Sequence, residues 1–320
     1  MSAPVAVSGK ERVPELDGVR ALAFLSVFIF HTFNVPLTWA GVDAFFVLSG
    51  FLITGILLRE KGKPGYFRRF YERRARRILP PLALFLIAAT VVFGAGWLRH
   101  WYWYVLFSAN IAQALHKVDH ESLGVLWSLA VEEQFYLIWP VVVFLLPEKA
   151  IAWSAGALLL IVPVLRAGAT PFFSDFAPIF HLTPFRMDLL AAGALLACLA
   201  RKNAKLFAAS TIGVYITGAV AGCALLGFSA FSWFKVSANS VPGNALLYSL
   251  TLLVSASLLI VALNQSGRAS WLLRLKPLQY LGVISYSMYL IHYAIILWLR
   301  GFVSNTWAIF APFADRNDRL

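Results

Sequence analysis

Long apolar runs alternate with short polar segments along most of the chain. A helix needs about 20 residues to cross a hydrocarbon core about 30 Å thick. Nine runs have about this length, at 19–37, 41–58, 79–98, 127–146, 150–165, 185–200, 206–228, 244–263 and 279–303. A tenth run, 101–116, is short, rich in Trp and Tyr, and interrupted by Asn110 and Gln113. The pattern predicts an all-α fold, a polytopic transmembrane helical bundle of about nine to ten membrane helices.

The composition supports a membrane protein. Hydrophobic residues make up 60% of the 320 positions and charged residues 13%, whereas about a quarter of the residues in a soluble domain are charged. The formal charge of +12 lies mostly in short segments between apolar runs, as is typical of cytoplasmic membrane loops. We therefore expect a lipid bilayer as partner and no nucleic acid. No linker or repeat is visible, which predicts a single domain over 1–320.

Basic residues indicate the orientation of the chain. Between Arg59 and Arg77 there are nine Lys or Arg residues and two Glu residues, and the positive-inside rule places this segment and the N-terminus in the cytoplasm. If 101–116 is interfacial or re-entrant, the basic segments 201–205 and 267–276 also lie inside. We therefore favour nine crossings and an outer C-terminus. The first apolar run lacks a following cleavage site, so we expect a retained helix.

The segment YFRRFYERRARRILPP ends directly at the third apolar run, and all of its basic residues are Arg. A guanidinium matches phosphate oxygens bidentately, whereas Lys offers a point charge. The segment therefore favours a polyanionic ligand held at the membrane face. A simple topology anchor is the alternative.

Three ionisable residues share one face of the first apolar run. Arg20 and His31 are eleven residues apart, which leaves them about 20° out of phase on a helix, and Asp17 lies about 40° to the other side. The helical rise puts His31 about 16 Å above Arg20, near the middle of the membrane. Such residues are typical of functional sites, and histidine exchanges protons near neutral pH. A histidine that bonds a neighbouring carbonyl is the alternative.

A second polar stripe lies in WSLAVEEQFYLIWP. Ser128, Glu132 and Tyr136 recur every four residues and share one helix face, while Glu133 points about 100° away. Stabilisation of the helix dipole by two acids is the alternative to a functional role.

Isolated polar residues lie in other apolar runs. Asp43 begins the second run with Gly50 and Thr54 on its face, a spacing that permits close helix packing, and helix capping is its alternative role. His292, in SYSMYLIHY, shares a face with the serine seven residues before it. His181, in an outer loop, is expected to be a solvated loop residue.

Several catalytic signatures are absent from the sequence. It has no Walker-type phosphate loop, H-E-x-x-H, C-x-x-C or G-x-S-x-G, so ATP hydrolysis, zinc hydrolysis and an elbow serine hydrolase lack support. Cys198 and Cys223 lie in apolar runs and indicate packing. We predict no metal site.

Six segments, in this order, resemble the acyltransferase family 3 of integral membrane acyltransferases. They are ELDGVRALAFLSVFIFH (15–31), GVDAFFVLSGFLIT (41–54), FYERRARRILPP (70–81), WSLAVEEQFYLIWP (127–140), FRMDLLAAGALLA (185–197) and SYSMYLIH (285–292). The resemblance implies transfer of an acyl group, usually acetyl, from cytoplasmic acyl-CoA to a hydroxyl of a cell-surface carbohydrate or glycolipid. It implies a bacterial inner membrane enzyme with acetyl-CoA as donor substrate and no permanently bound cofactor.

The resemblance also implies residue roles. His31 matches the family's essential histidine, and Arg20 its first-helix arginine. Arg74 and Arg77 match the R-x-x-R of the cytoplasmic loop, and 132–133 match the paired acids. Members usually carry a tenth span, and some add an SGNH esterase-like domain. The polar end APFADRNDRL leads us to expect that the final family helix is missing or shortened and that no SGNH domain is present.

The expected mechanism has His31 as general base, because an alcohol is a weak nucleophile at neutral pH. We expect Glu132 to orient His31 from a facing helix, and we include Glu133 among the catalytic candidates. The candidates for binding coenzyme A are Arg20, Arg73, Arg74 and Arg77. The candidates for substrate-binding or structural polar residues are Asp17, Asp43, Ser128, Tyr136, Arg186, Asp188 and His292.

Two other classes of function compete with acyl transfer. A transporter or flippase for a glycan or its precursor would explain His and Arg within the membrane, but no inverted repeat is visible. A structural membrane subunit would explain the small-residue helices and not the polar stripe. We expect the acceptor to bind among the outer segments 99–126, 166–184 and 229–243.

Overall fold

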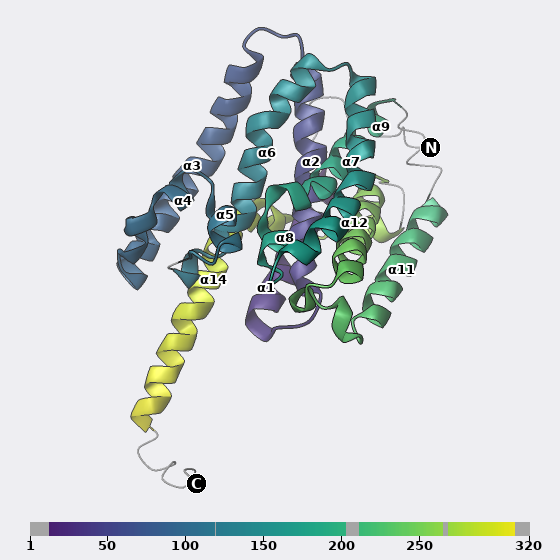
Figure 1. The fold of residues 1–320 in the computed structure, drawn as a ribbon. Helices are drawn as coiled ribbons and strands as arrows, with labels where there is room; N and C mark the ends of the chain where they lie inside the picture. Colours follow the sequence, from purple (N-terminus) through teal and green to yellow (C-terminus); the bar gives the residue numbers. More distant parts are fainter. Residues whose placement is uncertain (1–12, 119, 203–210, 265–267, 311–320) are drawn as a thin grey trace.

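The computed structural model describes residues 13–118, 120–202, 211–264 and 268–310, and no strand occurs among them. Nine helices correspond to the nine predicted apolar runs. They are α1 (Pro14–Phe33), α2 (Gly41–Glu60), α3 (Tyr66–Phe93), α6 (Leu126–Leu145), α7 (Glu148–Ala169), α9 (Met187–Lys202), α11 (Thr211–Phe228), α12 (Val241–Leu263) and α14 (Lys276–Phe310). Figure 1 shows them packed as a bundle. The prediction of an all-α helical bundle is confirmed.

Seven of the described helices are long and apolar enough to cross a membrane, namely α1, α2, α3, α6, α7, α12 and α14. The apolar part of α11, Ile212–Phe228, is shorter, and the start of its predicted run lies outside the described residues. With 16 residues, α9 is also shorter than a typical span. Among the described residues, the predicted nine to ten full-length spans are therefore reduced to seven, because two helices fall short of the length criterion.

The ambiguous run 101–116 forms two short helices, α4 (Tyr102–Val105) and α5 (Ala109–Ala114). Helices of four and six residues cannot cross a hydrocarbon core, so the run is not a helical crossing. Together with α8 (Ala177–His181), these helices lie in the half of the bundle farther from the turn between α2 and α3 (Figure 1).

Glycines bring two pairs of central helices into backbone contact. A Cβ atom on Gly50 of α2 would lie 1.9 Å from the Leu190 carbonyl oxygen of α9, and one on Gly193 would lie 1.9 Å from the Val47 oxygen. Between α14 and α1, a Cβ on Gly282 would meet the Asp17 oxygen at 1.9 Å. Small residues therefore permit this close packing, as predicted for Gly50. The close contacts of α2 with α9 and of α1 with α14 fix the relative positions of the helices within each pair.

Large apolar side chains stay exposed on the outward faces of the bundle. Val91 of α3 is 81% exposed, Leu160 of α7 75% and Leu84 of α3 69%. Contiguous apolar surface of this kind is unfavourable in water and is what a bilayer solvates. The C-terminal part of α14 extends away from the other helices (Figure 1).

Candidate active site

Two cavities lie at different heights along α1. The first, here called the arginine pocket, has a volume of about 100 Å³ and is lined by Arg20 near the start of α1. The second, here called the histidine cavity, has a volume of about 1080 Å³ and is lined by His31 in the last turn of α1. The polar side chains that line the arginine pocket are Arg20, Ser49, Arg74, Arg77, Ser128, Glu132, Tyr136, Ser285, Tyr286 and Tyr289.

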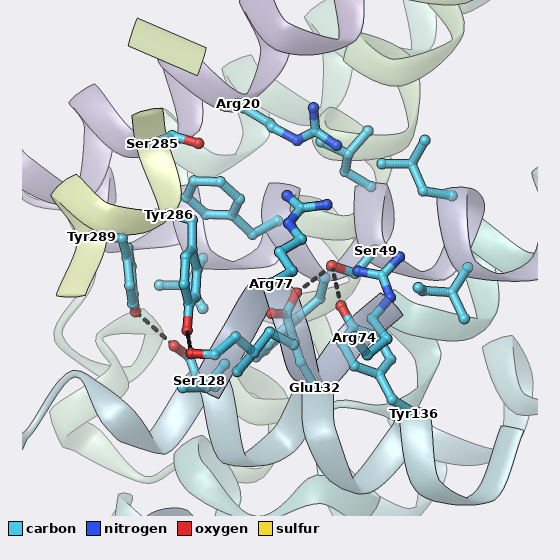
Figure 2. A pocket seen from close by; sticks show the side chains of 18 of the residues that line it. Arg20, Ser49, Arg74, Arg77, Ser128, Glu132, Tyr136, Ser285, Tyr286 and Tyr289 are labelled. Atoms are coloured by element: carbon cyan, nitrogen blue, oxygen red, sulfur yellow. Dashed lines mark hydrogen bonds between the residues drawn. The ribbon is translucent and has the colours of Figure 1, made fainter. Parts of the chain in front are cut away.

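Three guanidinium groups face the arginine pocket from two helices (Figure 2). Arg74 and Arg77 are three residues apart on α3, so R-x-x-R places both on one helix face. The Arg74 guanidinium lies over the Tyr136 ring, 5.2 Å from its centroid, which is cation–π geometry. Arg20 donates to Asp17 over 2.6 Å. With Glu132 as the one carboxylate in the described lining, the pocket is positively charged.

Ser49 of α2 links two members of the predicted stripe on α6. Its hydroxyl donates to the Glu132 carboxylate, and the Tyr136 hydroxyl donates to Ser49 Oγ over 3.0 Å. Figure 2 shows these bonds beside the arginines. Sequence reasoning missed Ser49, because no spacing rule connects it to a residue 83 positions along the chain. The predicted common face of Ser128, Glu132 and Tyr136 does line one pocket.

Two predicted residues lie outside this pocket. The Arg73 side chain is 56% exposed and has a guanidinium nitrogen 4.0 Å from Glu60, so the structure separates it from Arg74 and Arg77. Glu133 does not line the pocket, which agrees with its predicted direction on α6.

His31 and His292 form a hydrogen-bonded pair at the histidine cavity, here called the histidine dyad. His31 Nδ1 lies 3.0 Å from His292 Nε2, and His292 Nδ1 lies 2.7 Å from the Tyr289 carbonyl oxygen. A carbonyl only accepts, so in neutral rings the proton of His292 is on Nδ1 and its Nε2 accepts. His31 must then donate from Nδ1. This assignment by hydrogen bonding leaves the lone pair of His31 Nε2 available as a base.

The prediction that Glu132 orients His31 is wrong, because the two residues serve different cavities. Trp127 lines the histidine cavity, whereas Glu132, five residues and about 7.5 Å farther along α6, lines the arginine pocket. His292 of α14 holds His31 instead.

His31 lies in the last turn of α1, and its predicted depth near the middle of the membrane stays a prediction. The helix begins at Pro14 and ends at Phe33, followed by Asn34 with a left-handed φ of 53°. Arg300 of α14 fixes this end by donating to the carbonyl oxygens of His31 and Thr32 over 2.8 and 3.1 Å. The catalytic candidate therefore lies at one end of its helix.

A thin layer separates the two cavities. Val42 and Tyr289 line both of them, and the Tyr289 hydroxyl lies 2.7 Å from Ser128 Oγ. A group that moves from one cavity to the other would therefore pass these two side chains.

Asp43 and Arg186 form an ion pair that is fully buried. Arg186 Nη1 lies 3.1 Å from Asp43 Oδ1, and both side chains are 0% exposed. Thr251 also donates to Asp43, over 2.6 Å. The pair lines neither cavity; it joins α2 to the residue directly before α9, and Thr251 adds α12. For Asp43, this ion pair replaces the predicted capping alternative.

A second buried ion pair joins Arg166 to Asp188 over 2.8 Å, with both side chains 0% exposed. Asp188 was predicted as a polar site residue, and it too lies outside both cavities. Sequence reasoning missed Arg166, because an arginine at the end of an apolar run is also typical of a membrane loop.

His181 is not the solvated loop residue that the sequence predicted. It ends α8, lines the histidine cavity and is 9% exposed. All three outer segments that were expected to bind the acceptor reach this cavity, through Gln113, Phe180 and Lys235 among others. No group of His, Cys, Asp or Glu side chains in the described parts of the chain could hold a metal ion.

Residues 13–314 match the acyltransferase 3 family model, described as an acyltransferase domain. The chain belongs to the acyltransferase 3 family. The resemblance read from the six segments is confirmed, and so is the prediction of an acyltransferase.

Relatives of this acyltransferase 3 protein include bacterial O-acetyltransferases. It is 32% identical over 329 residues to the putative peptidoglycan O-acetyltransferase YrhL of Bacillus subtilis, covering 89% of this chain and 49% of that protein. It is 32% identical over 327 residues to the peptidoglycan O-acetyltransferase OatA of Listeria monocytogenes, with 90% and 50% covered. It is 29% identical over 327 residues to the O-acetyltransferase OatA of Staphylococcus aureus, with 91% and 51% covered.

The acyltransferase 3 domain thus spans about half the length of the curated relatives it matches. No solved structure matches the chain.

Proposed function

We propose that this chain is a single membrane acyltransferase domain that moves an acetyl group from acetyl-CoA to a hydroxyl of a cell-wall glycan of the peptidoglycan kind. Its location would be the bacterial inner membrane, with the N-terminus in the cytoplasm. One observation carries the proposal. A pocket with three arginines and a cavity lined by His31 lie at two heights along α1, and both are lined by Val42 and Tyr289.

The arginine pocket suits the donor. Coenzyme A carries a 3′-phosphate and a pyrophosphate, and Arg74 and Arg77 would bind phosphate oxygens bidentately. Both arginines lie in the first part of α3, within the Arg-rich segment that the positive-inside rule places in the cytoplasm. The pocket volume of about 100 Å³ is below the range of about 300–1,000 Å³ for small-molecule sites, so the pocket would take part of the slender pantetheine arm, while the nucleotide would stay at the opening.

The histidine dyad suits the chemistry of transfer. His31 Nε2 would take the proton of the acceptor hydroxyl as its oxygen attacks the thioester carbonyl carbon. A new C–O bond forms, the C–S bond breaks, and the departing coenzyme A sulfur receives the proton from His31. The transfer is direct, without an acetylated histidine.

His292 would stabilise the imidazolium that forms on His31. Its Nε2 accepts from His31 Nδ1, and its own Nδ1 is held by the Tyr289 carbonyl. This is the orienting role that a third group plays in a catalytic triad. Here a neutral imidazole would take that role in place of a carboxylate.

The experiment is an assay of the full chain in detergent with labelled acetyl-CoA and solubilised glycan strands. We expect label in the glycan with the wild type and none above background with His31→Ala. His116→Ala is the matched control, because His116 is 65% exposed and pairs with Asp175 at the surface. Undiminished transfer by His31→Ala would contradict the role of His31.

A further inference from the structure

His181 is a second histidine of the histidine cavity, and the dyad does not use it. Its Nδ1 lies 2.8 Å from the Ala177 carbonyl oxygen, so Nδ1 must carry the proton and Nε2 keeps a lone pair. Burial lowers the pKa of the His181 imidazole to about 4. At neutral pH this side chain is therefore an uncharged hydrogen-bond acceptor.

Aromatic rings hold His181 in a fixed corner of the cavity. The Trp127 ring meets the imidazole edge-on, with centroids 5.0 Å apart and an interplanar angle of 90°. Phe180 lies 4.9 Å from His181 and 5.1 Å from Trp127. These rings pack at centroid distances that aromatic pairs prefer, so the corner is preformed.

The rest of the cavity wall combines aromatic faces with few charges. Further aromatic lining residues are Phe30, Trp39, Phe176, Phe234, Tyr289 and Tyr293. Among the described lining residues, Glu121 and Lys235 are the charged ones and have opposite signs. The volume of about 1080 Å³ slightly exceeds the range of about 300–1,000 Å³ for small-molecule sites. The cavity therefore suits an uncharged ligand with both apolar faces and polar groups.

We propose that the corner formed by Trp127, Phe180 and His181 binds an uncharged pyranose ring of the acceptor glycan. The C–H face of the ring packs on the aromatic side chains, whose π faces are electron-rich. A hydroxyl or acetamido N–H of the ring donates to His181 Nε2. The inference rests on the proposed function, because the bound ring would present its reactive hydroxyl to His31 in the same cavity.

The lone pair of His181 discriminates between classes of ligand. An ionised phosphate or carboxylate has no proton to donate, so it would face another lone pair. A hydrocarbon tail would leave the Nε2 lone pair of His181 without a donor, which costs free energy. A sugar ring supplies both a donor for the lone pair of His181 and apolar C–H groups for the aromatic side chains.

The matched variants are His181→Asn and His181→Gln. The Asn amide can replace the Nδ1 donor to Ala177 and has no acceptor at the Nε2 position, whereas the longer Gln side chain places a carbonyl oxygen near that position. We expect His181→Asn to weaken acceptor binding and raise the acceptor KM by about tenfold, as one lost hydrogen bond does. Gln should restore most of the affinity, and kcat should change by less than about twofold in both.

Two measurements keep this inference separate from the proposed function. The first is binding of a β-1,4-linked tetramer of N-acetylglucosamine to the full chain, followed by tryptophan fluorescence without acetyl-CoA. The second is label transfer from acetyl-CoA to the same tetramer. Tetramer binding that is weakened in His181→Asn and restored in His181→Gln supports the site even if no label is transferred. In that case the proposed function is contradicted and the binding site is not.

Three outcomes would overturn the inference. The first is equal tetramer affinity in the wild type and His181→Asn, and the second is no tetramer binding by the folded wild type. The third is a loss of kcat with unchanged acceptor KM, which would make His181 a catalytic group. Melting temperature and acetyl-CoA affinity of each variant show whether it is folded. A variant that is unfolded is replaced by Phe180→Leu, for which we expect the same weakened tetramer binding, and unchanged binding would again overturn the site.

Discussion

Replacing His292 by Phe tests whether the histidine dyad orients the catalytic base. Phe keeps a ring in the space of the imidazole and removes the acceptor that lies 3.0 Å from His31 Nδ1. His31 becomes charged during transfer, and a hydrogen bond to a charged group contributes about 1.5–3 kcal/mol. At about 1.36 kcal/mol per tenfold, kcat should fall by about 10- to 150-fold. His31→Ala removes the base itself, and we expect a larger loss, of up to about 10⁴-fold.

The assay measures initial rates of label transfer at saturating glycan and varied acetyl-CoA. The acetyl-CoA KM should stay unchanged, because His292 does not line the arginine pocket. His292→Gln should recover part of kcat, since its amide oxygen can accept from His31. Ser287→Ala, at an exposed position of the same helix, is the control for damage to α14. A folded His292→Phe variant with wild-type kcat would refute the orienting role.

Three further predictions concern the donor, the buried ion pairs and the outer surface. Arg77→Gln should weaken acetyl-CoA binding by about 10- to 100-fold in a titration, while Arg73→Gln, at an exposed position, should leave the affinity unchanged; equal losses would contradict the assignment. Asp43→Asn leaves the buried Arg186 without its carboxylate and should destabilise the fold by about 3–5 kcal/mol, seen as a lower melting temperature, and a shift below 1–2 °C would argue against it. The pKa of Asp175 is lowered mainly by the hydrogen bond from the Ala177 backbone N–H and next by the hydrogen bond with His116. The Asp175 carboxylate therefore stabilises the folded protein above the ordinary aspartate pKa of about 4, and this contribution is lost as the pH falls below that value. Thermal melts of Asp175→Asn and wild type should therefore converge toward pH 3, and a difference that grows on acidification would contradict this sign.

Relations within one helix could be predicted from the sequence. Ser128, Glu132 and Tyr136 share a face because their spacing matches the helical repeat, and all three line the arginine pocket. Arg74 and Arg77 follow the same rule on α3. Local periodicity determines such faces wherever the helix is continuous.

Relations between helices could not be predicted, because they depend on which helices become neighbours. His31 and His292 are 261 positions apart, and Ser49 lies 83 positions from Glu132. The facing partner of His31 was therefore misassigned to α6. Close packing of α1 on α14, which Gly282 permits, brings the two histidines together.

The position of single polar residues along their helices, and their burial, also could not be predicted from the sequence. The hydropathy of the first run extends to position 37, but the helix ends at Phe33, so His31 lies in its last turn. Arg166 and His181 follow apolar runs and look like loop residues. Each is buried, Arg166 because Asp188 neutralises it and His181 because the Ala177 carbonyl satisfies its one donor.

The most direct test of a two-sided transfer uses sealed vesicles that hold the full chain in one orientation. Labelled acetyl-CoA is supplied on the side of the Arg-rich segment, and a membrane-impermeant glycan is confined to the other side. We predict that label reaches the glycan across the membrane with the wild type and not with His31→Ala. Transfer only when donor and glycan share one side, or equal transfer by His31→Ala, would contradict an arginine pocket and a histidine cavity that serve opposite faces of the membrane.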